Sequence, residues 1–182
     1  MPSLRVEVLF VQGGGKDVHD AWDNKLVASL EQALGAGYTI HYPRMPDEAD
    51  PHAQVWKKAI GRELSKLSDG VVVVGHSIGG AIVLDYLAEH DERRIAGLFL
   101  IATPFIGDGG WPSDELRRTS ETIAQLPDVP IYFYQGSDDE TVPIGHIEMF
   151  AKAVPHAKIR KLEHRNHQLN DDLSEVAQDV RR

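Results

Sequence analysis

Short apolar runs alternate with segments of helical periodicity along the whole chain. The runs predict six strands, at 6–11, 38–41, 71–74, 95–102, 131–134 and 157–162. Between them, apolar residues recur three or four positions apart, which predicts helices at about 20–34, 52–67, 78–89, 113–124, 144–153 and 171–180. This alternation is typical of strand–helix–strand units. We therefore expect an α/β fold of three layers, with a doubly wound, mostly parallel six-stranded sheet.

The third predicted strand leads into the most informative motif of the chain. It is an all-valine run with a glycine on each side, and such a strand lies buried on both faces of a parallel sheet. The sequence continues as Gly75-His76-Ser77-Ile78-Gly79. A serine in so sharp a strand-to-helix turn exposes its hydroxyl at the carboxyl edge of the sheet, and the crowded turn favours glycine two positions before and after it. Ser77 is therefore a candidate nucleophile.

The loops after the last two predicted strands carry groups that can activate this serine. A serine hydroxyl needs a base to accept its proton, and the base needs a third group to orient it. The first of these loops holds Asp138 and Asp139, and the second holds His164 and His167. Because the strands are expected to be parallel, the loops after their carboxyl ends lie at one edge of the sheet. We therefore expect an acid and an imidazole to meet Ser77 there.

These motifs are similar to those of the α/β-hydrolases, and among them to the small single-domain serine hydrolases of the retinoblastoma-binding-protein type. The resemblance covers essentially the whole chain. It is carried by the motif Gly75-His76-Ser77-Ile78-Gly79-Gly80, the loop 136–143, His167, and a Met45-Pro46-Asp47 loop that is followed by Trp56.

The resemblance implies a triad of Ser77, Asp139 and His167. The superfamily pattern Gly-x-x-Asp-x-x-Val-Pro places the acid at Asp139, whereas a slip of one residue would place it at Asp138. Asn166 stands where relatives usually have a glycine before the histidine, and asparagine tolerates a positive φ. A second interpretation treats His164 and His167 as metal ligands, but no further convergent ligand is evident.

An acyl-transfer site also needs donors for the oxyanion and a place for the acyl group. We expect the backbone amide of Ile78, at the start of its helix, to be one donor. The glycine loop after the first strand provides the second, at Gly14 or, as the alternative, at Gly13. Phe105 and Trp111 follow the fourth strand and are candidates for an acyl pocket, with core or lid packing as the other interpretation.

Two more segments are expected near the cleft. The first contains His19, Asp20 and Trp22, which follow the glycine loop and are candidates to line the cleft. In the alternative interpretation Asp20 caps a helix and Trp22 belongs to the core. The segment 103–127 is a short lid with room for one helix, which starts at Ser113. So short a lid predicts an open, shallow site that favours short acyl chains.

Composition narrows the class of protein. The chain has 182 residues, and we expect one domain, 1–182. With 19 basic and 28 acidic side chains its net charge is −9, which argues against nucleic acid or an anionic membrane as partner. The absence of cysteine excludes disulfides, thiolate catalysis and cysteine-type zinc sites. The first residues lead directly into a strand rather than a secretory signal, so we expect a cytoplasmic protein.

The sequence therefore predicts a serine hydrolase that cleaves small ester-like substrates through an acyl-enzyme, with no metal or organic cofactor and no indicated protein partner. Three alternatives stay open. The first is an α/β-hydrolase-fold binding protein without turnover. The second is an enzyme that uses the same triad for other chemistry, such as acyl transfer to an alcohol or carbon–carbon bond cleavage. The third is nucleotide binding at 13–15, although this loop matches no phosphate-binding motif.

Overall fold

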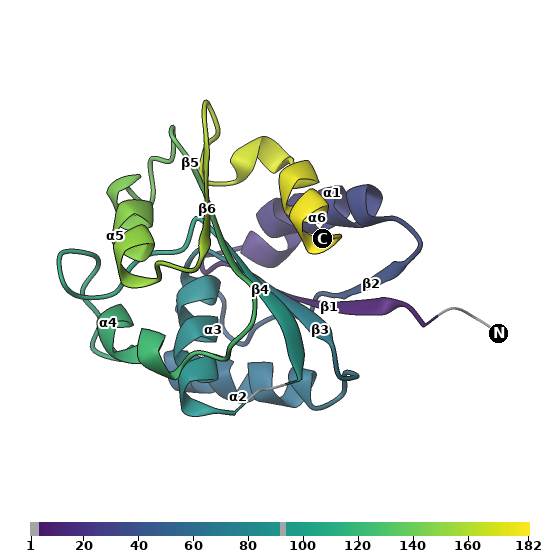
Figure 1. Cartoon of the computed structure of the whole chain (residues 1–182), viewed down its shortest axis with the longest axis horizontal. Helices are drawn as coiled ribbons and strands as arrows, with labels where there is room; N and C mark the ends of the chain where they lie inside the picture. Colours follow the sequence, from purple (N-terminus) through teal and green to yellow (C-terminus); the bar gives the residue numbers. More distant parts are fainter. Residues whose placement is uncertain (1–3, 92–93) are drawn as a thin grey trace.

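A computed structural model describes residues 4–91 and 94–182, and in it six parallel strands form one sheet between two layers of helices (Figure 1). The order of the strands across the sheet is β2-β1-β3-β4-β5-β6. The expected α/β-hydrolase fold is confirmed, and each strand lies at one of the predicted apolar runs. The strands are β1 (Val6–Val11), β2 (Tyr38–His41), β3 (Val71–His76), β4 (Ile95–Ile101), β5 (Ile131–Gly136) and β6 (Lys158–Leu162).

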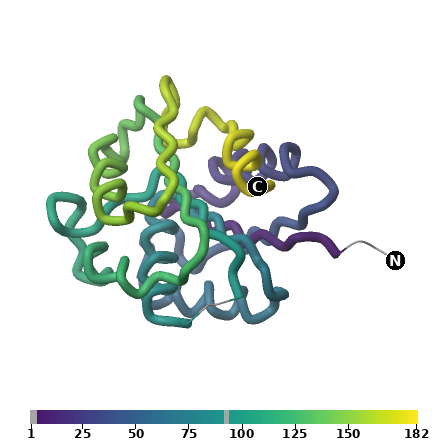
Figure 2. The backbone as a smooth tube through the Cα atoms, in the orientation of Figure 1, coloured from purple at the N-terminus to yellow at the C-terminus, as the bar shows by residue number. Residues whose placement is uncertain are grey.

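The two faces of the sheet are covered by different helices. On one face α1 (Asn24–Leu34) packs beside α6 (Ser174–Val180), and Figure 2 shows the C-terminal segment returning to α1. The opposite face is covered by α2 (Ala53–Leu64), α3 (Ile78–Glu89) and α5 (Gly145–Ala153). Within the described residues, no helix has both the length and the apolar character needed to cross a bilayer.

Alternate residues of the central strands supply two separate cores. On β1, Val8 and Phe10 pack into the core under α1 and α6, whereas Leu9 and Val11 pack into the core under α2 and α3. The valines of β3 alternate in the same way. This follows from the two-residue period of a strand, and it explains why residues 8–11 of β1 and 71–74 of β3 are apolar at every position.

The strand order places the candidate site. The chain runs from β1 outward to β2 and then crosses to β3 on the other side of β1. Ligands in open α/β sheets bind beyond the carboxyl ends of the strands at such a reversal. The loop after β1 and the turn after β3 both lie at this edge, because β1 and β3 pair in parallel up to Val11 and Gly75.

Two helix predictions were wrong in their extent. The helix expected from Ser113 begins only with α4 (Thr119–Thr122) and continues as the short 3-10 helix η2 (Ile123–Gln125). The Ser113 hydroxyl instead accepts the N–H groups of Glu115 and Leu116, which makes a local turn that competes with helix formation. The helix expected from residue 20 is divided into a π-helix, η1 (Val18–Asp23), and α1.

Candidate active site

Ser77 occupies the turn between β3 and α3 in a conformation that few residues adopt. Its φ is 53° and its ψ is −131°, and such a strained backbone persists only where its surroundings impose it. The surroundings are close: a Cβ on Gly79 would lie 1.9 Å from the carbonyl oxygen of Gln12, and one on Gly75 would lie 2.8 Å from the Cα of Gly80. The glycine spacing therefore has the steric cause that the sequence suggested.

The structure brings Ser77, His167 and Asp139 into one hydrogen-bonded chain. His167 Nε2 lies 2.9 Å from Ser77 Oγ, and His167 Nδ1 lies 2.8 Å from Asp139 Oδ2. The three residues follow the carboxyl ends of three different strands: Ser77 follows β3, Asp139 follows β5 and His167 follows β6. Exposure increases from the fully buried carboxylate of Asp139 to the imidazole of His167, which is 18% exposed.

Asp139 is fixed on both of its oxygens. While Oδ2 faces His167, Oδ1 accepts the N–H groups of Thr141 and Val142 at 2.8 and 2.9 Å. Burial opposes the charged form, but the hydrogen bond and charge of His167, together with the two N–H groups, hold the pKa of Asp139 below its ordinary value. An ionised Asp139 orients the imidazole so that Nε2 faces the serine.

The neighbouring candidates, Asp138 and His164, take no part in these hydrogen bonds. Asp138 is exposed and accepts the hydroxyl of Ser137 at 3.1 Å, so its carboxylate faces away from His167. His164 is 89% exposed and lies 3.9 Å from Asp138. Of the two acids and two histidines that the sequence offered, the structure thus brings one of each to Ser77.

The loop after β1 leaves one amide free beside the serine. Gly13 donates its N–H to Asp23 Oδ2 at 2.7 Å, and Gly15 donates to the carbonyl of Glu48 at 2.6 Å. The N–H groups of Gly14 and Ile78 have no partner among residues 4–91 and 94–182. A Cβ on Gly14 would lie 2.9 Å from Ile78 Cγ2, so the two free amides are close together. Gly14, and not Gly13, is available as a donor.

A second histidine–aspartate pair lies behind the first, and the sequence did not indicate it. His76 Nδ1 lies 2.9 Å from Asp23 Oδ2, and both side chains are almost completely buried. His76 Nε2 lies 3.1 Å from the backbone carbonyl oxygen of His167, and the two imidazole centroids are 5.0 Å apart.

Of the three residues around η1 that were expected to line the cleft, Trp22 lines a cavity together with His167. Trp22 is 52% exposed and therefore does not belong to the core. Asp20 pairs with Arg44 at 2.6 Å and caps no helix, since its side chain lies in the first turn of η1. His19 stacks on Tyr42 at a centroid distance of 4.0 Å.

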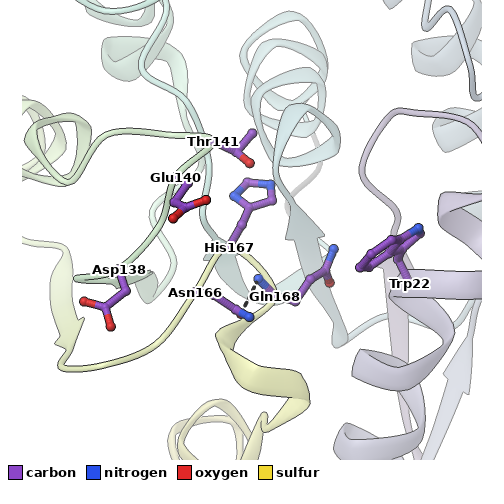
Figure 3. Close-up of a pocket in the computed structure, with 7 residues that line it drawn as sticks. All are labelled: Trp22, Asp138, Glu140, Thr141, Asn166, His167 and Gln168. Atoms are coloured by element: carbon purple, nitrogen blue, oxygen red, sulfur yellow. Dashed lines mark hydrogen bonds between the residues drawn. The ribbon is translucent and has the colours of Figure 1, made fainter.

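Two cavities lie next to the hydrogen-bonded chain. The larger, of about 670 Å³, is bounded by His167, Thr141 and the acidic side chains of Asp138 and Glu140, with Trp22 opposite (Figure 3). The smaller, of about 190 Å³, lies beside Ile78, and its lining combines apolar side chains with the polar Ser113 and Glu115. Its lining includes Pro51, Ala53, Ile78, Ile82 and Leu116.

Phe105 and Trp111 line neither of these two cavities. Phe105 is buried, packs edge-on to Phe150 at a centroid distance of 5.0 Å, and donates its N–H to His146 Nδ1 at 2.9 Å. Trp111 is half-buried and packs against the ring of His146. The structure thus places both residues in packing between the lid segment and α5, the second of the two interpretations.

Two solved structures illustrate what this chain is similar to. Est1E from Butyrivibrio proteoclasticus is 18% identical, with a TM-score of 0.74 over 98% of this chain and 86% of that one. XC6422 from Xanthomonas campestris, described as an α/β serine hydrolase without a lid, is 16% identical, with a TM-score of 0.67 over 100% of this chain and 83% of that one. At these identities the likeness establishes the fold.

Sequence comparison adds a relative and a family. The uncharacterized protein YfhR of Escherichia coli (strain K12) is 30% identical over 87 residues, which span 43% of this chain and 31% of YfhR, less than a third of its length. The family model described as serine hydrolase matches residues 9–173, a range that includes Ser77, Asp139 and His167. The chain therefore belongs to the serine hydrolase family.

Proposed function

We propose that this protein hydrolyses small esters with short acyl groups, using Ser77 as nucleophile, His167 as general base and Asp139 as the orienting acid. The observation that carries the proposal is the continuous hydrogen-bonded chain from Asp139 through His167 to the hydroxyl of Ser77. A hydroxyl in this arrangement can lose its proton to the imidazole as it attacks.

Two half-reactions follow from this geometry. Ser77 Oγ bonds to the carbonyl carbon while its proton passes to His167 Nε2, and the leaving alcohol departs with that proton. Water then attacks the acyl-serine, gives its proton to His167, and releases the acid as Ser77 regains a proton. Asp139 stays ionised throughout and stabilises the imidazolium. The free amides of Gly14 and Ile78 donate to the oxyanion in both steps.

The positions of the two cavities support a proposal for where the two parts of the substrate lie. His167 must give its proton to the leaving group, so that group belongs in the larger cavity, which His167 lines. The acyl chain then extends into the small cavity beside Ile78. The acidic side chains of Asp138 and Glu140 disfavour anionic leaving groups.

A series of p-nitrophenyl esters tests this proposal. The wild-type protein is expected to hydrolyse the acetate and butyrate and to discriminate against the dodecanoate, because the cavity beside Ile78 is small. A fluorophosphonate probe should label the wild-type protein and leave Ser77→Ala unlabelled. Faster turnover of the dodecanoate than of the acetate would refute the short-acyl assignment. Absence of labelling would favour a binding protein without turnover.

A further inference from the structure

The buried pair of Asp23 and His76 is more than a packing contact, because both nitrogens of His76 face acceptors. A backbone carbonyl can only accept a hydrogen bond, so the nitrogen opposite the His167 carbonyl must carry a proton. The other nitrogen faces Asp23 Oδ2, which also accepts the N–H of Gly13 and so has the character of an ionised carboxylate. Two donating nitrogens make the ring an imidazolium.

The electrostatics of the pair agree with this assignment. Burial alone would lower the pKa of His76, but the charge of Asp23, its hydrogen bond and the His167 carbonyl together raise it. Burial would likewise raise the pKa of Asp23, but His76 and the Gly13 amide hold it below its ordinary value. Each member of the pair therefore favours the charged form of the other, which opposes the effect of burial.

The pair joins three segments that the proposed reaction has to keep in register. Asp23 holds Gly13, the neighbour of the free amide at Gly14. His76 directly precedes Ser77 in the turn after β3. The far side of His76 holds the backbone of His167. Small displacements of such groups are costly, since a misplacement of about 1 Å can reduce a rate roughly 100-fold.

We propose that Asp23 and His76 form a charged clamp, a pair of positioning residues that fixes the oxyanion loop and the loop of His167 relative to Ser77. This inference rests on the proposed function. Neither side chain touches the reacting atoms. The clamp acts as one unit, because loss of the Asp23 charge leaves His76 unable to keep both protons. The group that takes the place of Asp23 Oδ2 cannot then satisfy both Gly13 and a neutral His76 that still donates to His167, so at least one of these three contacts fails.

Steady-state kinetics on p-nitrophenyl acetate test the clamp with Asp23→Asn, His76→Gln and the double variant. We expect each single variant to lose roughly 10- to 100-fold in kcat with little change in KM, because the substrate cavities stay intact while the donors shift. Since the two residues act as one unit, the double variant should be no slower than the slower single variant. Asp17→Asn, an exposed change at the residue that precedes η1, is the matched control and should behave as wild type.

Several outcomes would overturn the clamp. One is a folded Asp23→Asn or His76→Gln protein whose kcat stays within about two-fold of wild type; another is a double variant whose loss is the product of the single losses. If a single variant does not fold, the double variant, which leaves no buried charge without a partner, carries the kinetic test. A wild-type protein that turns over no ester would instead refute the proposed function, and the clamp with it.

Nuclear magnetic resonance gives a readout independent of turnover. At pH 8, where an exposed histidine is neutral, the wild-type spectrum should contain two slowly exchanging ring N–H signals with the nitrogen shifts of an imidazolium. Both signals should vanish in His76→Gln. A single ring N–H signal from His76 would contradict the charged assignment.

Discussion

Two histidine–aspartate pairs lie side by side at the carboxyl edge of this sheet, and they differ in what the outer nitrogen of each ring faces. Both rings contact a carboxylate through Nδ1, at 2.8 Å for His167 and 2.9 Å for His76. The Nε2 atom of His167 faces the hydroxyl of Ser77, whereas that of His76 faces a carbonyl. A hydroxyl can give up a proton and a carbonyl cannot.

In the proposed reaction this difference separates a base, His167, from a positioning residue, His76. His167 can exist with Nε2 unprotonated, is partly exposed and lies on a cavity, so it can exchange protons with a substrate. His76 has no such freedom, because both of its protons are committed and the ring is buried. The same pair of residue types therefore serves chemistry at one position and geometry at the other. We therefore expect variants of the two pairs to lower kcat by very different factors.

The largest effect is expected from removal of the nucleophile or the base. Ser77→Ala and His167→Ala should each lower kcat by about 10⁶-fold, because either change abolishes the proton relay. The loss expected for His76→Gln is several orders of magnitude smaller. Steady-state and burst kinetics on p-nitrophenyl acetate measure both. Equal losses at the two histidines would remove the distinction between base and support.

The next effect concerns the acid. Asp139→Asn should lower kcat by about 10⁴-fold, since the amide stabilises the wrong tautomer of the imidazole. Asp138→Asn is the matched change one residue away, and its effect should be slight, because that carboxylate does not contact His167. The comparison is made on kcat at saturating substrate. A larger loss in Asp138→Asn than in Asp139→Asn would show that the two acids exchange places in solution.

A smaller loss is expected in the loop that the clamp holds. Gly14→Ala would place a Cβ 2.5 Å from Pro51 Cγ and 2.9 Å from Ile78 Cγ2, so the loop must shift and carry the amide of Gly14 with it. Loss of one oxyanion donor costs about 10²- to 10³-fold in kcat. Gly37→Ala is the control, since nothing lies within 4 Å of its new Cβ. Wild-type kcat in Gly14→Ala would remove that amide from the oxyanion site.

The two pairs also differ in how far the sequence predicts them: local patterns indicate His167 and Asp139, but not Asp23. Ser77 was predictable because glycine spacing, an apolar strand and a helix all constrain the same turn. His167 and Asp139 were predictable as members of short loops after known strands, with one residue of uncertainty in the acid. These signals are local, and each depends on a strand or turn whose pattern is visible in the chain.

Asp23 was not predictable, because its position depends on an irregular helix. The segment Val18–Asp23 is a π-helix, and its wider turn changes which residues face inward. Their position after the glycine loop makes Asp20 and Trp22 candidates from the sequence, and both are exposed, whereas Asp23 is buried against His76. In the lid segment, a local turn at the Ser113 hydroxyl and a hydrogen bond from the N–H of Ala53, in α2, to Glu115 replace the expected helix.

The smallest predicted effects are on stability, and they have opposite signs for the acids and for His76. The pKa values of Asp23 and Asp139 are lowered from an ordinary 3.8, so the unfolded chain binds more protons than the folded one in acid. Their contribution to the free energy of unfolding is present above that value and is lost as the pH falls through the folded pKa. The pKa of His76 is raised from 6.5, so its contribution is present below 6.5 and is lost as the pH rises through the folded pKa.

Urea unfolding of wild type and variants between pH 3 and pH 9 separates these contributions. Asp139→Asn should weaken the acid dependence and leave the alkaline side unchanged. The double variant Asp23→Asn/His76→Gln should weaken the dependence on both sides, because it removes a group of each sign. If its curve remained parallel to wild type above pH 6.5, His76 would not change its charge on unfolding, and the ring would have to be neutral in the folded protein.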